Sequence, residues 1–131
     1  WDDTLFVTNT AKGLVVKVPE GPLGRPGTPT VVTRRPRLVG ADGLAFDPHG
    51  NIWVTVTGPF YSNEVPLPLT GQRLMLLSRT GDLWHVTEDA PWMDSPNALA
   101  RGRTVTTGDR MFVLNGSMHT ATPELVSFRL R

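Results

Sequence analysis

Hydrophobic and polar residues alternate with a period of two through several short segments of the chain. The clearest is residues 52–57, where Ile, Val and Val alternate with Trp, Thr and Thr, as in a strand with one buried face. An Asp-Pro-His-Gly-Asn turn at residues 47–51 separates this segment from the short, mainly apolar segment at residues 42–46. Pro presets φ, and Gly and Asn tolerate positive φ. The pattern therefore predicts two strands joined by a tight turn.

The same order of turn residue, apolar residue, aromatic residue and Val occurs three times. The copies are residues 3–10, 50–57 and 109–116, and residues 95–100 echo residues 40–45 ahead of the last two copies. A spacing of roughly 45–60 residues is typical of β-propeller blades with variable loops. We therefore expect an all-β fold of propeller blades, with strands near residues 4–9, 14–18, 29–33, 42–46, 51–57, 73–78, 82–86, 98–101, 110–115 and 124–130.

Composition agrees with this class and excludes others. The 13 Gly and 12 Pro supply turns and oppose long helices, while 4 Trp and 5 Phe supply a core. A net charge of +1 provides no field that would draw the chain to nucleic acid or a membrane. The basic residues 34–37 lack the interleaved aromatics of a nucleic-acid site. The absence of Cys excludes disulfides and thiolate metal sites and leaves the compartment open.

The repeated segments also occur in an order that resembles a known family. Residues 5–10, 39–47, 95–100 and 111–116 resemble the C-terminal half of the SMP-30/gluconolactonase/LRE-like six-bladed β-propellers. A strictosidine-synthase-like or NHL-type propeller is the alternative. The resemblance implies about half a propeller: an incomplete blade at 1–38, a full blade at 39–90 with a long loop at 58–73, and a terminal blade at 91–131. Because the chain begins at Trp1 and not Met, we expect a missing or processed N-terminus.

The resemblance also implies a candidate site. In that family one divalent cation on the propeller axis is held by a Glu, Asn side chains and an Asp, and the Asp corresponds to Asp42. Oxygen ligands of this kind suit Ca²⁺, Mg²⁺, Mn²⁺ or Zn²⁺, and the same Asp is the family's candidate general base. Gly43 would let the backbone crowd the axis. The alternative is that Asp42 is a turn residue bonded to its own backbone.

Further candidates lie where the loops should reach the same face of the propeller. Asn97 is equivalent to Asp42 in the next blade and is interpreted as pocket lining or an Asx turn. Asn9, Asn115 and His119 follow the aromatic-Val segments. His49 and His85 are expected at the surface.

The long loop 58–73 offers three more candidate residues. Tyr61 and Asn63 could hydrogen-bond the hydroxyls of a sugar or an organic acid while Phe60 shields the site. The alternative is that the loop packs against a neighbouring blade or subunit.

Two functions remain open. The first is a metal-dependent hydrolase of lactones or related esters, acting on a small molecule and completed by a second copy of the chain or by a complementary N-terminal half. The second is a non-catalytic propeller scaffold or ligand-binding module with a degenerate site. Fold alone does not decide between them. Neither nucleic acid nor a membrane is an expected partner.

Overall fold

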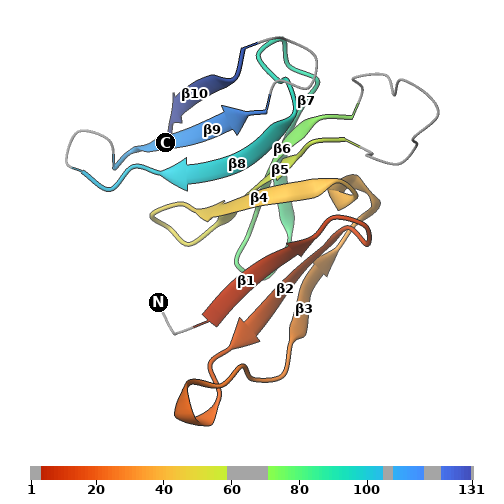
Figure 1. The fold of residues 1–131 in the computed structure, drawn as a ribbon, viewed down its shortest axis with the longest axis vertical. Coiled ribbons are helices and arrows are strands. Elements are labelled where there is room, and N and C mark those ends of the chain that lie inside the picture. The colour runs from red at the N-terminus through yellow and green to blue at the C-terminus, as the bar shows by residue number, and fades with distance from the viewer. Residues whose placement is uncertain (1–3, 59–70, 105–107, 117–121, 131) are drawn as a thin grey trace.

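The structure is a computed structural model that describes residues 4–58, 71–104, 108–116 and 122–130 (Figure 1). Within these residues the regular structure consists of ten strands and two short 3-10 helices, Pro22–Gly24 and Pro36–Leu38. The expected all-β class is thereby confirmed. No helix in the described part is long and apolar enough to cross a membrane.

Each predicted strand is present, with ends displaced by at most about two residues, the ordinary uncertainty of such boundaries. The strands are β1 (Thr4–Asn9), β2 (Leu14–Pro19), β3 (Thr30–Arg34), β4 (Ala41–Phe46), β5 (Ile52–Val56), β6 (Arg73–Leu77), β7 (Leu83–Glu88), β8 (Pro96–Arg101), β9 (Arg110–Asn115) and β10 (Glu124–Arg129).

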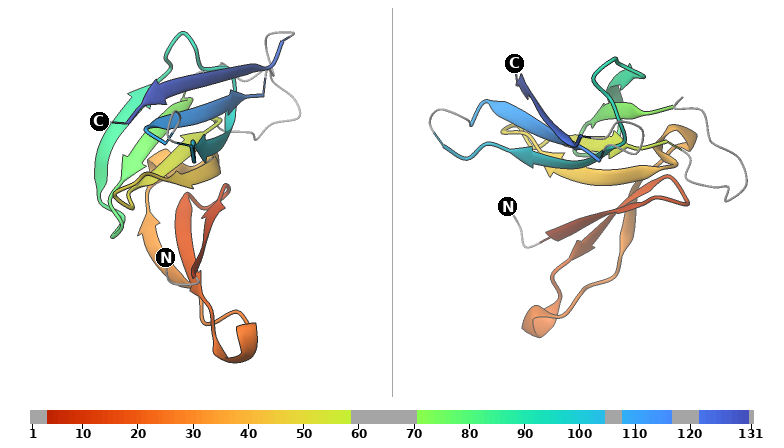
Figure 2. Two further views of the ribbon diagram at one scale, coloured as in Figure 1. Left: turned by 90° about the vertical axis from the view of Figure 1, so that its left-hand side faces the viewer. Right: turned by 45° about the horizontal axis from the view of Figure 1, so that its top comes forward.

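The strands form three antiparallel sheets, each a simple meander. The first sheet has the order β1-β2-β3, the middle sheet β4-β5-β6-β7, and the last sheet β8-β9-β10. Strands β1, β4 and β8 lie side by side, so the sheets fan out from a common inner edge (Figures 1 and 2). The sheets are not closed into a ring, and the boundaries of the predicted blades stay a prediction.

The sequence repeat shows which strands correspond. The three aromatic-Val segments are β1, β5 and β9. In the middle and last sheets these strands follow the inner strands β4 and β8, whereas β1 is itself the inner edge of the first sheet. By the same correspondence β3 matches β7. Among the described residues, the middle sheet is therefore the one with all four strands, and the last sheet has no counterpart of β7.

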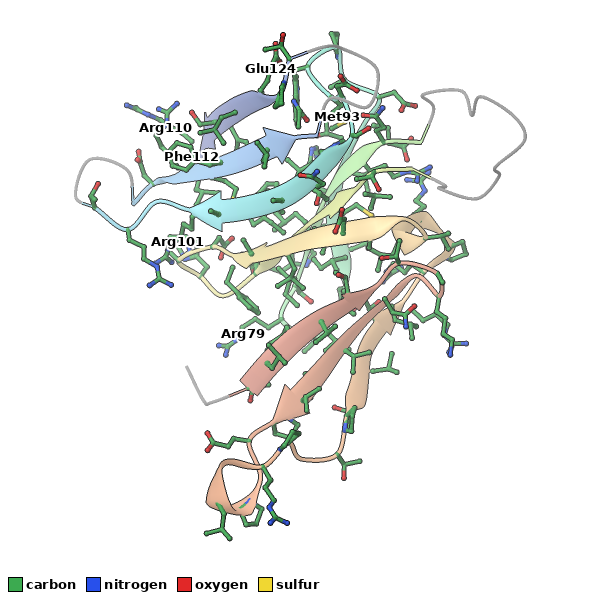
Figure 3. All side chains as sticks on the ribbon, viewed as in Figure 1. Arg79, Met93, Arg101, Arg110, Phe112 and Glu124 are labelled. Carbon is green, nitrogen blue, oxygen red and sulfur yellow. The ribbon has the colours of Figure 1, made fainter. Side chains whose placement is uncertain are left out.

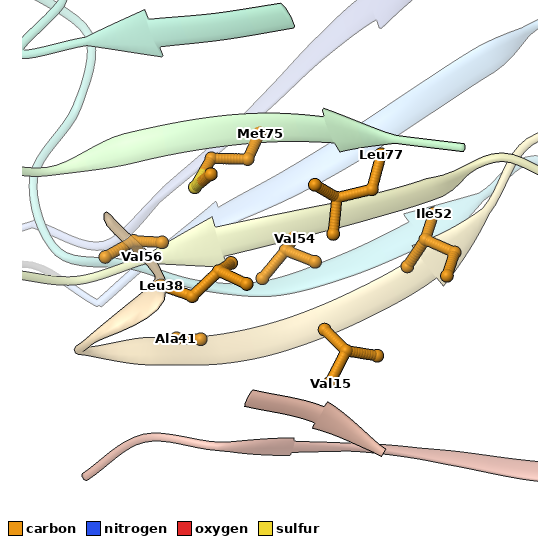
Figure 4. Packing of buried hydrophobic residues seen from close by; sticks show 8 residues of the cluster. All are labelled: Val15, Leu38, Ala41, Ile52, Val54, Val56, Met75 and Leu77. Carbon is orange, nitrogen blue, oxygen red and sulfur yellow. The ribbon is translucent and has the colours of Figure 1, made fainter. Parts of the chain in front are cut away.

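A continuous aliphatic core joins the first and middle sheets (Figure 4). Val15 from β2 packs against the middle sheet, where Val54, Met75 and Leu77 are fully buried. On the inner side Phe6 meets Phe46 edge to face, with ring centroids 4.9 Å apart. Packing of alternate side chains from two facing sheets is what the period-two pattern predicts.

Candidate functional site

Asp42 lies in a β-bulge near the start of the inner strand β4. The pairing of β4 with β5 shifts between Ala41 and Leu44, so residues 42 and 43 fall outside the regular ladder. Pairing of β8 with β9 shifts at the equivalent place, between Pro96 and Ala98, around Asn97. Bulges re-aim side chains and are common beside active sites. The two residues equated by the sequence repeat thus occupy equivalent bulges.

The inner strands approach closely at this bulge, and Gly43 makes the approach possible. A Cβ on Gly43 would lie 2.7 Å from the Ala98 Cα and 2.8 Å from the Asn97 backbone oxygen. Real Cβ contacts of that length to backbone atoms essentially never occur. The crowding expected at residue 43 is therefore present, and it places Asp42 and Asn97 on adjoining strands.

Three threonines fix the backbone around Asp42, and sequence reasoning did not single them out. Thr8 Oγ1 donates to the Asp42 carbonyl oxygen at 2.7 Å, and Thr10 Oγ1 donates to the Ala41 carbonyl oxygen at 2.8 Å. From the other side, the Gly43 amide donates to Thr55 Oγ1 at 2.9 Å. In the sequence, the alternation of Thr8 and Thr55 with apolar residues predicts only that both lie in strands, and it gives no signal for these hydrogen bonds.

The Asp42 carboxylate makes no hydrogen bond or ion pair with the described residues. Although the residue is exposed, partial burial of the carboxyl raises its pKa above the ordinary value of 3.8. Asp47 provides the contrast, because its carboxylate accepts hydrogen bonds from the amides of His49 and Asn51 and from Asn51 Nδ2. Asp47 is thus a turn residue of the kind considered for Asp42, and Asp42 lacks such bonds.

Asn97, on the adjoining inner strand, has a second side-chain oxygen without a partner. Its Oδ1 is buried and has no hydrogen-bond partner in the described part of the chain. A buried acceptor of this kind ordinarily finds a donor, water or an ion. The Asn97 amide group lies against Gly116. A Cβ at residue 116 would be 2.6 Å from Asn97 Nδ2, so only a glycine leaves room for this amide.

The chemistry of these two side chains can be compared with that of a cation site. A carboxylate and an amide oxygen are ligands that hard divalent cations accept, although Ca²⁺ takes six to eight. Among the described residues, no three His, Cys, Asp or Glu side chains gather as a metal site. The residues present therefore fit such a cation in kind and supply only some of its ligands.

Two further candidates lie at the same end of the sheets as Asp42, and both side chains make local hydrogen bonds. Asn9 Oδ1 accepts from the Lys12 amide at 3.0 Å. The buried Asn115 donates from Nδ2 to the Trp92 carbonyl oxygen at 2.6 Å, and its Oδ1 accepts from the Asp94 amide at 3.4 Å.

The remaining candidates fall into two groups. His49, in the β4–β5 turn, and His85, on β7, are exposed as expected. Four candidates lie outside the described residues: Phe60, Tyr61, Asn63 and His119.

The opposite end of the inner strands has a different chemistry. A hollow of about 550 Å³ is lined there by apolar side chains and by Arg101 and Arg103. Arg101 is labelled at the end of β8 in Figure 3. It includes Ala45 and Phe46, at the C-terminal end of β4. Side-chain oxygens thus lie near the start of β4 and β8, and arginine side chains lie near the end of β8.

Comparison with known proteins supports the fold. No protein-family model matches the chain, and no curated protein matches it. Among solved structures it is similar to a luciferin-regenerating enzyme, with a TM-score of 0.62 and 16% sequence identity. The match covers 95% of this chain and 40% of that one, so the chain spans less than half of that protein's length. At this identity the likeness concerns the fold, and it agrees with a propeller-like arrangement of the three sheets.

Proposed function

We propose that the chain is about half of a six-bladed propeller and forms part of a metal-dependent hydrolase of lactones or related esters, of the SMP-30/gluconolactonase kind. The observation that carries the proposal is a pair of side chains on adjoining inner strands whose oxygens have no hydrogen-bond partner among the described residues. They are the Asp42 carboxylate and the buried Oδ1 of Asn97. Both come from bulges that remove the residue from the regular ladder.

In this proposal Asp42 and Asn97 hold a divalent cation and Asp42 also handles a proton. A bound cation would supply Lewis-acid polarisation of the lactone carbonyl. Asp42 takes a proton from the attacking water, whose oxygen bonds to the carbonyl carbon. The ring C–O bond then breaks, and the proton passes to the leaving alkoxide to give a hydroxy acid.

The proposal requires further blades, and the two end faces of the sheet stack are suited to receive them. Leu5 and Val7 are 64% and 43% exposed on the face of the first sheet opposite Phe6. On the last sheet Leu114 and Leu125 are cross-strand partners that are 41% and 67% exposed. Exposed apolar faces of this kind mark interaction surfaces.

We propose that these faces are covered by a second copy or by a complementary N-terminal half. If the 131 residues act alone, two copies related by a two-fold axis would each place the first sheet against the partner's last sheet. Such closure would direct two Asp42 carboxylates toward one channel. Light scattering is expected to give twice the 14.4 kDa of one chain. A compact particle of 14.4 kDa would contradict closure by a second copy.

Activity is tested by hydrolysis of γ- and δ-lactones and an aryl ester with added Ca²⁺, Mg²⁺, Mn²⁺ or Zn²⁺. Asp42→Asn should abolish cation-dependent turnover and preserve the fold, because the amide keeps the shape and loses the charge and the base. Glu20→Gln is the matched control, since it removes an exposed carboxylate that lies just after β2. Turnover that Asp42→Asn leaves unchanged would overturn the assignment of Asp42.

The alternative is a non-catalytic scaffold or ligand-binding module. It is favoured by the small number of ligands, because the described residues offer only two oxygen-bearing side chains at the bulges, Asp42 and Asn97. If the parent chain, alone or in its assembled form, binds no divalent cation and hydrolyses no lactone, the scaffold function is the better conclusion.

A further inference from the structure

The hollow at the C-terminal ends of β4 and β8 combines an apolar lining with two cationic groups. It lies where two neighbouring inner strands end, and its volume of about 550 Å³ is in the range of about 300–1,000 Å³ that is typical of small-molecule pockets. The described residues that line it include no Asp or Glu. They are Ala45, Phe46, Leu99, Ala100, Arg101 and Arg103.

The register of the last sheet explains why two arginines reach the same hollow. Arg101 on β8 pairs with Met111 on β9, which is fully buried. Because paired residues point to the same side of an antiparallel sheet, Arg101 projects from the buried face of the last sheet. The Gly102 amide donates to the Arg110 carbonyl oxygen at 3.0 Å, so the ladder extends one residue beyond β8. Strand alternation then returns Arg103 to the side of Arg101.

The two guanidinium groups have no acceptor within the part of the chain that the structure describes. Arg101 is half-buried, yet neither it nor Arg103 makes a hydrogen bond or an ion pair with the described residues. Arg110 provides the contrast, because its guanidinium donates twice to Ser127 Oγ, at 3.2 and 2.7 Å. The planar guanidinium fork matches a carboxylate or a phosphate, so these two groups are available to an anion.

We propose that this hollow binds an organic carboxylate with an apolar body, such as a medium-chain fatty acid. The carboxylate accepts hydrogen bonds from Arg101 and Arg103, and the hydrocarbon covers Phe46 and Leu99. Burial of apolar surface distinguishes such a ligand from inorganic phosphate, which presents no apolar surface to this lining. The site lies at the opposite end of β4 from Asp42 and does not depend on the proposed hydrolysis.

The probe is octanoate, titrated with a chelator present so that no divalent cation bridges the ligand to the protein. Calorimetry measures the affinity, and the methyl signals of Ala45 and Ala100 in nuclear magnetic resonance spectra locate the ligand. We expect saturable binding with a Kd of about 1 mM and shifts of both methyl signals. Acetate, which lacks the tail, should bind at least about tenfold more weakly. Octyltrimethylammonium, which carries the opposite charge, should leave both methyl signals unchanged.

Three variants test the part played by the arginines. Arg101→Gln should weaken octanoate binding about tenfold, and Arg103→Gln, which changes an exposed side chain, about threefold. Arg25→Gln is the matched control, because it removes an exposed arginine from the segment between β2 and β3, and it should leave binding unchanged.

Four results would each overturn the proposal. They are absence of saturable binding at about 10 mM octanoate, equal affinity of Arg101→Gln and the parent, octanoate-induced shifts that spare Ala45 and Ala100, and binding of inorganic phosphate as tightly as octanoate. The last result would indicate a site for inorganic anions to which the apolar lining contributes nothing.

Discussion

The two faces of the middle sheet are built differently, although the same strands supply both. Toward the first sheet, β5 and β6 direct Val54, Met75 and Leu77, which are fully buried in the aliphatic core. Toward the last sheet, the intervening residues include Thr55 and Leu76. Thr55 Oγ1 accepts a hydrogen bond from the Gly43 amide. Leu76 lines a cleft of about 1020 Å³ that Trp84 also lines.

Polar contacts replace aliphatic packing at part of the second interface. The Ser95 amide, just before β8, donates to Gln72 Oε1, just before β6, at 3.0 Å in a buried position. Asp42 and Asn97 lie at the inner edge of this interface, where β4 and β8 adjoin. The interface with the first sheet is thus closed by aliphatic packing, whereas the interface with the last sheet includes polar contacts and the residues of the proposed site.

The largest expected effect is on stability, and it compares Met75 with its neighbour Leu76, whose side chains point to opposite faces of the middle sheet. Met75→Ala should lower the free energy of unfolding by about 2–5 kcal/mol, because it leaves a cavity in a closed core. Leu76→Ala should cost about 1–2 kcal/mol, since its side chain already borders open space. Urea unfolding at one protein concentration measures both. Equal losses would show that the two interfaces are equally closed.

The next effect tests how closely the inner strands β4 and β8 approach each other. Gly43→Ala should destabilise the fold by about 1–3 kcal/mol, because its Cβ meets backbone atoms of β8. Gly24→Ala is the control, with a positive φ of 71° and its nearest contact to a flexible Glu20 oxygen at 3.4 Å. It should cost about 1 kcal/mol. If thermal unfolding shows that Gly43→Ala loses less stability than Gly24→Ala, β4 and β8 do not approach each other closely at residue 43.

The smallest effect concerns the pH dependence of stability at Asp42. Burial raises the folded-state pKa above 3.8, so the contribution of this group is favourable below pH 3.8 and is lost as pH rises through the folded pKa. At neutral pH the charged carboxylate therefore opposes folding. Asp42→Asn should unfold at a slightly higher temperature than the parent at pH 7, and the difference should disappear near pH 3. A variant less stable than the parent at pH 7 would indicate a structural Asp.

The sequence predicted the strands well because their signal is local. Alternation in residues such as 52–57, with turn residues before each aromatic-Val segment, placed each strand. It could not show that Thr8 bonds to the Asp42 backbone, since they lie 34 residues apart. The cleft beside Trp84 depends on how two sheets meet, and a one-dimensional pattern carries no information on that space.

If Asp42 and Asn97 bind one cation, titration with Mn²⁺ followed by nuclear magnetic resonance should detect it at these two residues. Paramagnetic broadening should begin at the Gly43 and Ala98 amides and the Asn97 side-chain amide, and Asp42→Asn should remove it. These signals report the site without requiring turnover. Broadening that begins instead around exposed carboxylates such as Asp82 or Asp89, or that persists in Asp42→Asn, would contradict the account.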